Sequence, residues 1–360
     1  MSPTPAPCLI IAEAGVNHNG SLERALEMVA VAAHAGADAI KFQTFRAEQL
    51  ATAGARRAAY QARELGDGDQ LSMLRGLELA DADFARLAAR CRELGIAFLS
   101  TAFEPEGLDM LLGLGMARVK IPSGEITNPR LLLAAARSGR PIILSTGMAT
   151  EADVAAALGV LACGLLGWTR RGDAAFANAL ADPAGRRAVA HRVTLLQCTS
   201  AYPAPPDSIN LKAMHTLAER FGLAVGLSDH SQGIAVPTAA AALGARVIEK
   251  HFTLDRTLPG PDHAASLEPD ELAAMVGAIR TVEAALGDGH KAPTEVEHDT
   301  ARVARRSIVA ARPIAAGEPF TEEALAFRRP GTGLSPMACW TLLGRPAGRP
   351  YAAGEMIDAP

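Results

Sequence analysis

A repeat of short apolar runs constrains the fold of this chain more than any other feature of its sequence. Each run ends in polar residues, and a helical pattern follows most of them. Eight such strand–helix units within about 285 residues predict a (β/α)8 barrel, an α/β fold whose active site lies at the C-terminal ends of its parallel strands. The predicted strands are Cys8–Ala12, Ala37–Ile40, Ile96–Leu99, Ala117–Ile121, Pro141–Leu144, Val193–Leu196, Ala224–Leu227 and Val247–Phe252.

Charged and hydroxyl residues stand at the ends of these runs, so in a barrel they should point into one bowl. Lys120 lies inside an apolar run, and a buried ammonium group needs an anionic partner. The residues expected in the bowl are Glu13, Lys41, Lys120, Ser123, Ser145, Ser200, Ser228, His230, Glu249 and His251.

The segments between the strands contain recognisable helices. Ser21 is placed to cap a helix that carries Glu23 in its first turn, and further helices are expected near residues 56–65 and over 81–94. An arginine- and alanine-rich segment, 164–191, interrupts the pattern between strands five and six. We expect it to be an extra helical segment that takes no part in the chemistry.

A second, smaller domain is expected after the barrel. The barrel domain should span residues 1–286, and the polar stretch 287–301 has the composition of a linker. Residues 302–360 then carry strand patterns at Ser307–Ala310 and Met356–Asp358. About sixty residues form only a marginal core, so this domain should dock on the barrel of its own or a partner subunit.

Composition excludes several classes of function. The net charge of −4, with no long run of one sign, does not suit nucleic acid or an acidic membrane surface as partner. No apolar run is long enough to span a bilayer, and the N-terminus lacks a secretory signal pattern. The five scattered cysteines form no Cys-x-x-Cys pair, which indicates reduced thiols and a cytoplasmic protein.

Two histidines indicate a metal site. The runs that end near His230 and His251 flank one helical pattern, so they should be neighbouring parallel strands with both imidazoles at the same rim. Two imidazoles with open positions suit Mn, Zn, Fe or Co better than Ca or Mg. The alternative is that each histidine is a hydrogen-bonded residue at a strand end.

Two lysines among hydroxyl groups indicate an anion site. Lys41 and Lys120 would supply charge, and Ser123, Ser145 and Ser228 short donors, for a phosphorylated carboxylate. The alternative is a structural lysine–glutamate network with Glu13, Glu125 and Glu249 as partners. Since no Gly-rich phosphate loop ending in Lys-Ser/Thr is present, nucleoside triphosphate chemistry is not expected.

Motifs along nearly the whole chain resemble those of the sialic acid synthases, enzymes that condense phosphoenolpyruvate with an N-acetylated sugar. The matching segments are Ile11–Gly20, Ile40–Thr44, Lys120–Glu125, Ser145–Met148, Cys198–Ser200 with Tyr202–Pro203, both histidine strands and the Arg329–Gly331 loop. The resemblance implies a TIM barrel followed by an antifreeze-like (SAF) β-rich domain, in a homodimer that exchanges these domains.

The resemblance also implies roles for individual residues. His230 and His251 would hold a divalent metal, usually Mn2+, with Mg2+ or Co2+ as alternatives, and Glu13 and Glu125 would transfer protons. Positions matching phosphoenolpyruvate contacts are Lys41, Lys120, Ser123, Ser145, Ser200 and Ser228. Positions matching sugar contacts are Gln43, Tyr202, Asp262 and, from the partner's tail, Arg329.

The expected activity is that of an N-acetylneuraminate synthase using an N-acetylmannosamine-type sugar. A legionaminate synthase acting on 2,4-diacetamido-2,4,6-trideoxymannose is the alternative, because the runs 260–263 and 266–269 resemble both kinds of enzyme more than pseudaminate synthases. Two other possibilities are a metal-dependent aldolase or hydrolase, which would not need the phosphate bowl, and a carbohydrate- or ice-binding protein. The polar strand ends argue against the last.

Overall fold

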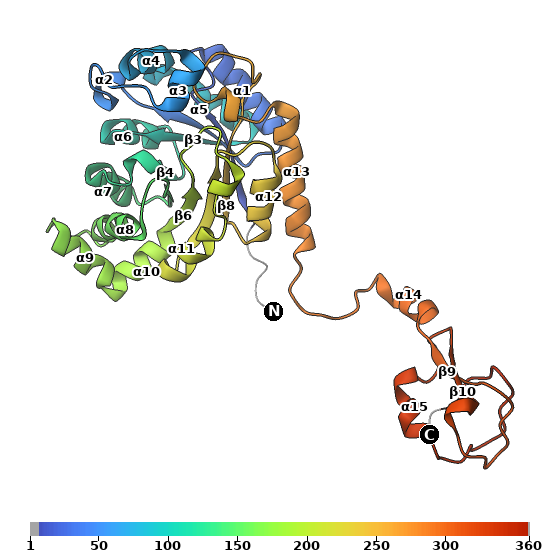
Figure 1. Cartoon of the computed structure of the whole chain (residues 1–360). Helices are drawn as coiled ribbons and strands as arrows, with labels where there is room; N and C mark the ends of the chain where they lie inside the picture. Colours follow the sequence, from blue (N-terminus) through green and yellow to red (C-terminus); the bar gives the residue numbers. More distant parts are fainter. Residues whose placement is uncertain (1–6, 359–360) are drawn as a thin grey trace. The chain divides into compact units, whose positions relative to one another are not determined.

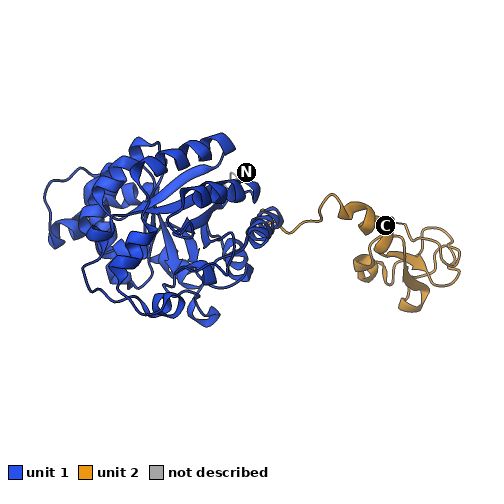
Figure 2. Ribbon diagram, turned by 90° about the horizontal axis from the view of Figure 1, so that it is seen from above, with its two compact units in different colours: residues 1–287 blue, residues 288–360 orange. Residues whose placement is uncertain are grey.

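The computed structural model describes residues 7–358, and the chain divides into two compact units after Gly287 (Figures 1 and 2). The first unit contains a ring of strands surrounded by helices, and the second is a small β-rich unit (Figure 1). Within the described range, no helix combines the length and the apolar character needed to cross a membrane.

Eight parallel strands build the first unit, which confirms the predicted barrel. They are β1 Leu9–Gly15, β2 Ala39–Thr44, β3 Ala97–Ala102, β4 Val119–Ile121, β5 Ile142–Ser145, β6 Val193–Cys198, β7 Ala224–Asp229 and β8 Val247–His251. The hydrogen-bonded order is β3-β2-β1-β8-β7-β6-β5-β4, and the two end strands, β3 and β4, lie in contact and close the ring. All strand ends that carry polar residues therefore meet at one rim.

Most strands extend further than predicted from the sequence, into the polar residues that were expected to follow them. Glu13, Lys41, Ser145 and Cys198 are all strand residues. The apolar run marks only the part of a strand that faces apolar neighbours, whereas the strand itself continues as long as its backbone has hydrogen-bonding partners. These polar side chains are consequently held on the barrel's rigid frame.

Helices surround the strands, and additional helices lie in the segment after β2 and in the segment before β6. They are α1 Leu22–His34, α2 Ala47–Leu50, α3 Ala59–Leu65, α4 Gln70–Leu77, α5 Asp81–Leu94, α6 Pro105–Gly113, α7 Pro129–Arg137, α8 Glu151–Leu165, α9 Asp173–Ala181, α10 Pro183–Arg192, α11 Ala213–Phe221, α12 Ala235–Ala242 and α13 Pro269–Ala285. The Ser21 hydroxyl accepts a hydrogen bond from the Arg24 amide, so the predicted cap is confirmed. The predicted extra helical segment before strand six is α9 and α10, which pack on α8.

Two separate apolar clusters support the first unit. The larger one packs the barrel against its helices. Within it Gly226 of β7 has no space for a side chain, because a Cβ there would lie 2.2 Å from the Val247 carbonyl oxygen. The smaller cluster lies under α2–α4 and includes Val16, Phe45 and Leu74. We call residues 45–80, which contain these three helices, the β2–β3 excursion.

The second unit contains a two-stranded antiparallel sheet of β9 Ser307–Ala310 and β10 Leu325–Arg328. The prediction for β9 is confirmed, but the predicted strand at 356–358 is wrong, since only Met356 forms an isolated bridge, to Val309. The helix α14, Glu297–Ala304, occupies part of the segment expected to be a linker, and α15 is Cys339–Leu342. The core of this unit consists of Ile308, Ala310, Ile314, Phe320, Ala324, Leu342, Ala347, Tyr351 and Ile357.

Candidate active site at the barrel rim

A cavity of about 480 Å³ opens at the C-terminal ends of the barrel strands. Most of the site residues expected from the sequence line it: Glu13, Lys41, Gln43, Lys120, Ser123, Glu125, Ser145, Ser200, Tyr202, Ser228, His230 and His251. A larger cavity of about 710 Å³ lies along α7–α9, but apart from Asp153 and Asp173 its lining carries no ionisable side chain. The chemistry therefore belongs to the smaller cavity.

Two buried lysines and two buried glutamates form one charge network at the base of this cavity. The Lys41 ammonium lies 2.8 Å from Glu13 Oε2 and 3.6 Å from Glu249 Oε2, and it donates a hydrogen bond to Thr101 Oγ1 at 2.9 Å. The Lys120 ammonium lies 3.3 Å from Glu249 Oε1. Glu249 is thus the anionic partner that a buried Lys120 required, and it is shared between both lysines.

Burial and the neighbouring lysines separate the pKa values of the two glutamates. Burial raises the pKa of Glu13 to about 7, against the opposing charge of Lys41. Burial alone would also raise the pKa of Glu249, but Lys120, Lys41 and a hydrogen bond from Ser228 outweigh it and lower that pKa to about 2. With Glu249 ionised and Glu13 able to hold a proton near neutral pH, two ammonium groups face one fixed carboxylate, which leaves the base of the cavity positively charged.

Hydroxyl groups surround the network. Ser228 Oγ donates to Glu249 at 2.9 Å, and Ser123 Oγ accepts from the Gly147 amide at 2.9 Å. Ser145 Oγ is buried and has no hydrogen-bond partner within the described part of the chain. A buried hydroxyl that lines a cavity without a partner is a candidate ligand contact.

Gly147 is required by this convergence of hydroxyl groups. A Cβ at this position would lie 2.4 Å from Ser200 Oγ and 2.8 Å from Ser123 Oγ. These are closer than real Cβ contacts, so any other residue here would displace the hydroxyl groups of Ser123 and Ser200.

His230 and His251 lie side by side at the rim, with ring centroids 5.3 Å apart. The Nδ1 atom of His230 donates to the Thr199 carbonyl at 2.8 Å, so Nε2 is the ring nitrogen left for a ligand. Burial opposes the charged form of His230, but hydrogen bonds to Cys198 and to the Thr199 carbonyl outweigh it and raise the pKa of the ring. Burial holds the pKa of His251 well below its ordinary value, with His230 and Lys41 adding to the effect, so this ring is neutral. Its Nδ1 atom has no hydrogen-bond partner among the described residues.

These two imidazoles fit a divalent metal. Both rings line the cavity, and a nitrogen lone pair without a partner is what a metal-ligating histidine offers. Nowhere in residues 7–358 do three His, Cys, Asp or Glu side chains come close enough to hold an ion by themselves. An ion bound here would therefore keep coordination positions open for oxygen atoms of water or substrate.

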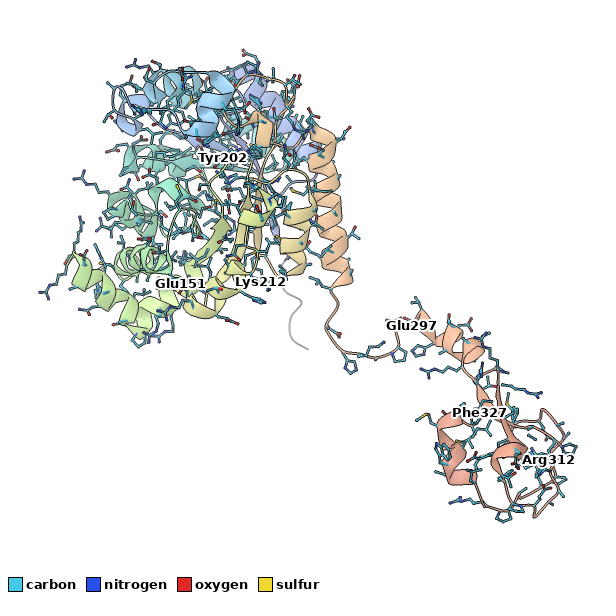
Figure 3. All side chains as sticks on the ribbon, viewed as in Figure 1. Glu151, Tyr202, Lys212, Glu297, Arg312 and Phe327 are labelled. Atoms are coloured by element: carbon cyan, nitrogen blue, oxygen red, sulfur yellow. The ribbon has the colours of Figure 1, made fainter. Side chains whose placement is uncertain are left out.

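Tyr202 connects the histidines to the β2–β3 excursion. Its ring lies 4.1 Å from the His230 ring and edge-on to His251 at 5.6 Å between centroids, and Tyr60 of α3 stacks on its other side at 4.8 Å. Arg63 donates to the Tyr202 carbonyl at 2.9 Å. Figure 3 shows Tyr202 close to these N-terminal helices, so the excursion covers one side of the cavity.

Three expected site residues, Glu125, Asp262 and Arg329, lie outside the charge network and the histidine pair. Glu125 lines the cavity and accepts a hydrogen bond from Asn128 at 2.6 Å. Asp262 is buried beside the site, its Oδ2 atom 3.9 Å from His251 Nδ1, and burial raises its pKa to about 6. Arg329 belongs to the second unit, where it is exposed on the loop that follows β10.

Sequence analysis missed several residues that line the cavity. Thr101 lies at the polar end of β3, as expected from the sequence, but its hydrogen bond from Lys41 was not predicted. Tyr60, Gln61, Gln70 and Leu74 come from the β2–β3 excursion, whose short helices carry no strong periodic pattern. No signal in the sequence placed that segment over the barrel rim.

Comparisons with known proteins agree with this geometry. A profile of the NeuB family matches residues 28–291, and a profile of the SAF domain matches residues 305–360. N,N'-diacetyllegionaminic acid synthases from Legionella pneumophila and Campylobacter jejuni are each 43% identical to this chain; both alignments cover 97% of it, and 93% and 98% of those proteins. The crystal structure of an N-acetylneuraminic acid synthetase from Leptospira borgpetersenii, at 34% identity, superposes with a TM-score of 0.67 over 82% of this chain and 90% of that one.

Proposed function

This chain belongs to the NeuB family and ends in a SAF domain, and we propose that it condenses phosphoenolpyruvate with an N-acetylated sugar to give a nonulosonic acid and phosphate. The observation that carries the proposal is the positive charge network of Lys41, Lys120 and Glu249 in the same cavity as two adjacent imidazoles. The network suits an enol phosphate. The histidines suit the activation of a carbonyl beside it.

Among nonulosonic acids, we propose legionaminic acid as the product. From the sequence alone N-acetylneuraminate was the first expectation and legionaminate the second, and the comparisons favour the second. The two relatives at 43% identity are N,N'-diacetyllegionaminic acid synthases over nearly the full length of this chain. The corresponding substrate is 2,4-diacetamido-2,4,6-trideoxymannose.

The cavity wall beside the β2–β3 excursion agrees with this substrate. Leu50 and Leu74 of the excursion line the cavity, as do Phe103 and Met148. A 6-deoxy methyl group and the methyl of an acetamido group suit apolar surface better than the hydroxyl groups they replace.

The proposed metal is Mn2+, held by His230 and His251. A bound divalent ion would act as a Lewis acid on the aldehyde oxygen of the open-chain sugar. The unpartnered Nδ1 of His251 and the free Nε2 of His230 support this assignment.

The proposed reaction forms one carbon–carbon bond and breaks the carbon–oxygen bond to phosphate. The enol carbon of phosphoenolpyruvate attacks the aldehyde carbon, a carbon–carbon bond forms, and the aldehyde oxygen takes up a proton. Positive charge develops on the phosphate-bearing carbon, where water adds and loses a proton. The carbon–oxygen bond to phosphate then breaks while the new hydroxyl group passes its proton to the departing phosphate, which leaves the 2-keto group of the product.

The residues of the chain bind the reactants and move these protons. Lys41 and Lys120 neutralise the phosphate and carboxylate, and Ser123, Ser145 and Ser200 donate hydrogen bonds to them. Ser228, whose hydroxyl donates to Glu249 in this structure, joins them when its hydroxyl turns toward the ligand. Glu13, whose pKa is raised to about 7, is the proposed group that exchanges protons with water and departing phosphate. Glu125 is a second candidate, while Gln43, Tyr202 and Asp262 would contact the sugar.

We further propose a homodimer with exchanged tails, in which Arg329 contacts the sugar bound by the other subunit. The support is that Arg329 is exposed on a loop braced by Ser307, which donates to the Pro330 carbonyl at 2.6 Å and accepts from Gly333 at 2.8 Å. A braced loop presents its guanidinium at a defined place, which suits recognition of an N-acyl group.

A phosphate-release assay with two sugars tests the function. With phosphoenolpyruvate and Mn2+, the expected result is rapid turnover of 2,4-diacetamido-2,4,6-trideoxymannose and slow turnover of N-acetylmannosamine. The reverse preference would move the assignment to N-acetylneuraminate. No phosphate release with either sugar, from protein that binds phosphoenolpyruvate, would contradict the proposed reaction.

A further inference from the structure

Asp229 and Lys250 form a fully buried ion pair immediately next to the two histidines in the chain. Lys250 Nζ lies 2.6 Å from Asp229 Oδ2, and both side chains are 0% exposed. They are register partners on β7 and β8, and the histidines are the residues that follow or end these strands. Nothing in the proposed reaction uses this pair.

The pair lies on the opposite face of the sheet from the cavity. Side chains alternate along a strand, and Ser228, Glu249 and His251 line the cavity. Asp229 and Lys250 therefore face away from it, behind the strand ends that carry the imidazoles. Their ion pair links the two strands at this point.

The same pair also fixes the backbone on the other side of His230. Asp229 Oδ1 accepts from the Ser231 amide at 3.0 Å, and Asp229 Oδ2 accepts from Ser231 Oγ at 3.0 Å. Lys250 Nζ donates to the Ser231 carbonyl. These contacts fix both chain neighbours of His230, Asp229 and Ser231. They also involve Lys250, the residue that precedes His251.

A purely stabilising role explains this arrangement poorly. Burying an ion pair costs desolvation that its attraction only partly returns, and apolar replacements are often as stable. What the pair offers instead is a defined geometry between β7 and β8. That geometry sets the separation of the two imidazoles, and a metal site is sensitive to it.

We propose that Asp229 and Lys250 are positioning residues that hold His230 and His251 at the separation needed to bind a divalent cation. The inference rests on the metal site of the proposed function. It adds that the affinity for the ion depends on two residues that never touch it.

The test is a titration of metal-free protein with Mn2+. The electron paramagnetic resonance signal of free Mn2+ reports binding directly and needs no turnover. The variants are Asp229→Asn, Lys250→Met and the double variant Asp229→Asn/Lys250→Met. We expect each to weaken Mn2+ binding by about 10- to 100-fold, the range known for residues that orient metal ligands.

Thermal unfolding without metal separates positioning from stability. Lys250→Met leaves a buried carboxylate unpaired and should lower the Tm, and the double variant should recover part of the loss. We expect Mn2+ affinity to stay low in the double variant, whereas a purely structural role predicts that affinity recovers together with the Tm.

Asp38→Asn is the matched control. Asp38 also combines an ion pair, to Arg280 at 2.6 Å, with a hydrogen bond from a backbone amide, that of Ile10 at 2.7 Å, but it precedes β2 at the opposite end of the barrel. This variant should lower the Tm and leave Mn2+ affinity unchanged.

A folded double variant that binds Mn2+ within twofold of the wild type would overturn the inference. If the Asp229 and Lys250 variants do not fold, Ser231→Ala replaces them, because it removes one hydroxyl donor to Asp229. We expect its Mn2+ affinity to fall by about threefold or more, and an affinity within twofold of the wild type would again overturn the inference. Wild-type protein that binds no Mn2+ would overturn the metal site itself, and this inference with it.

Discussion

Glu13 and Lys41 are register partners on β1 and β2, and their side chains meet at 2.8 Å inside the barrel. Burial raises the pKa of Glu13 to about 7, so Glu13 loses its proton as the pH rises from 6 to 8. The positive charge available to phosphoenolpyruvate then falls by one unit.

Glu13→Gln should remove this pH dependence. Glutamine stays neutral, so the variant should bind phosphoenolpyruvate about as well as the wild type at pH 6 and better at pH 8, by a factor on the order of ten. Calorimetric titration at both pH values, without sugar, measures the ratio and cancels the ligand's own ionisation. The kcat of Glu13→Gln should fall sharply if Glu13 transfers a proton. An equal ratio of affinities at both pH values would contradict the assignment.

Lys120→Ala should abolish measurable phosphoenolpyruvate binding while the barrel stays folded. It removes one of two ammonium groups and leaves Glu249 with only Lys41, 3.6 Å away, as counter-charge. We expect the KM for phosphoenolpyruvate to rise at least 100-fold. Arg140→Ala, a change of an exposed cation outside the cavity, is the control. An aldolase that does not use phosphoenolpyruvate would show no such difference.

Removing the metal should stop turnover reversibly. Dialysis against EDTA is expected to abolish phosphate release, and Mn2+ should restore it in the wild type but not in His230→Gln or His251→Gln. His251 Nδ1 has no hydrogen-bond partner among the described residues, so His251→Gln should lose little stability, whereas His230→Gln also gives up the hydrogen bond to the Thr199 carbonyl. Full activity in EDTA would rule out the metal's role.

Tyr60→Ala should affect the sugar more than phosphoenolpyruvate. Tyr60 stacks on Tyr202 at 4.8 Å but lies on the excursion rather than at the charge network. We expect the sugar KM to rise about tenfold and the phosphoenolpyruvate KM to change by less than twofold. Tyr60→Phe keeps the stacked ring and should behave like the wild type. Equal effects on both substrates would indicate that the excursion stabilises the whole cavity.

Mixing two inactive variants tests the exchanged tails. Lys120→Ala disables the barrel site, and Arg329→Ala disables the tail, so neither homodimer should turn over. If each tail serves the other subunit's site, heterodimers formed by refolding the mixture contain one intact site and should recover about a quarter of wild-type activity. Deleting residues 288–360 should leave a folded barrel, because the larger apolar cluster lies within residues 8–279. If the mixture stays inactive although heterodimers are present, the tails are not exchanged.

The barrel and its charged rim were predictable because both follow from local patterns. Apolar runs that end in lysine, glutamate or histidine give the strand and the face of the sheet together, and parallel strands bring these ends to one place. Glu13, Lys41, Lys120 and Glu249 were all identified in this way. How their charges are shared was not predictable, since Glu249 lies 3.3 Å from a lysine that is distant in sequence.

What the sequence did not reveal depends on packing between distant segments. Tyr60 reaches Tyr202 because a separate apolar cluster holds α2–α4 beside the rim. Strand β10 forms by pairing with β9, and the expected strand at 356–358 contributes only one bridge, from Met356. Such contacts depend on which partners are available in three dimensions, and one segment's composition does not determine them.

The β2–β3 excursion packs on an apolar cluster that is distinct from the one that packs the barrel. A mutation among its surface or cavity-facing residues therefore leaves the interior of the barrel intact. Protein engineers seeking a synthase for a new sugar can randomise the β2–β3 excursion and leave the lysines and glutamates of the charge network unchanged.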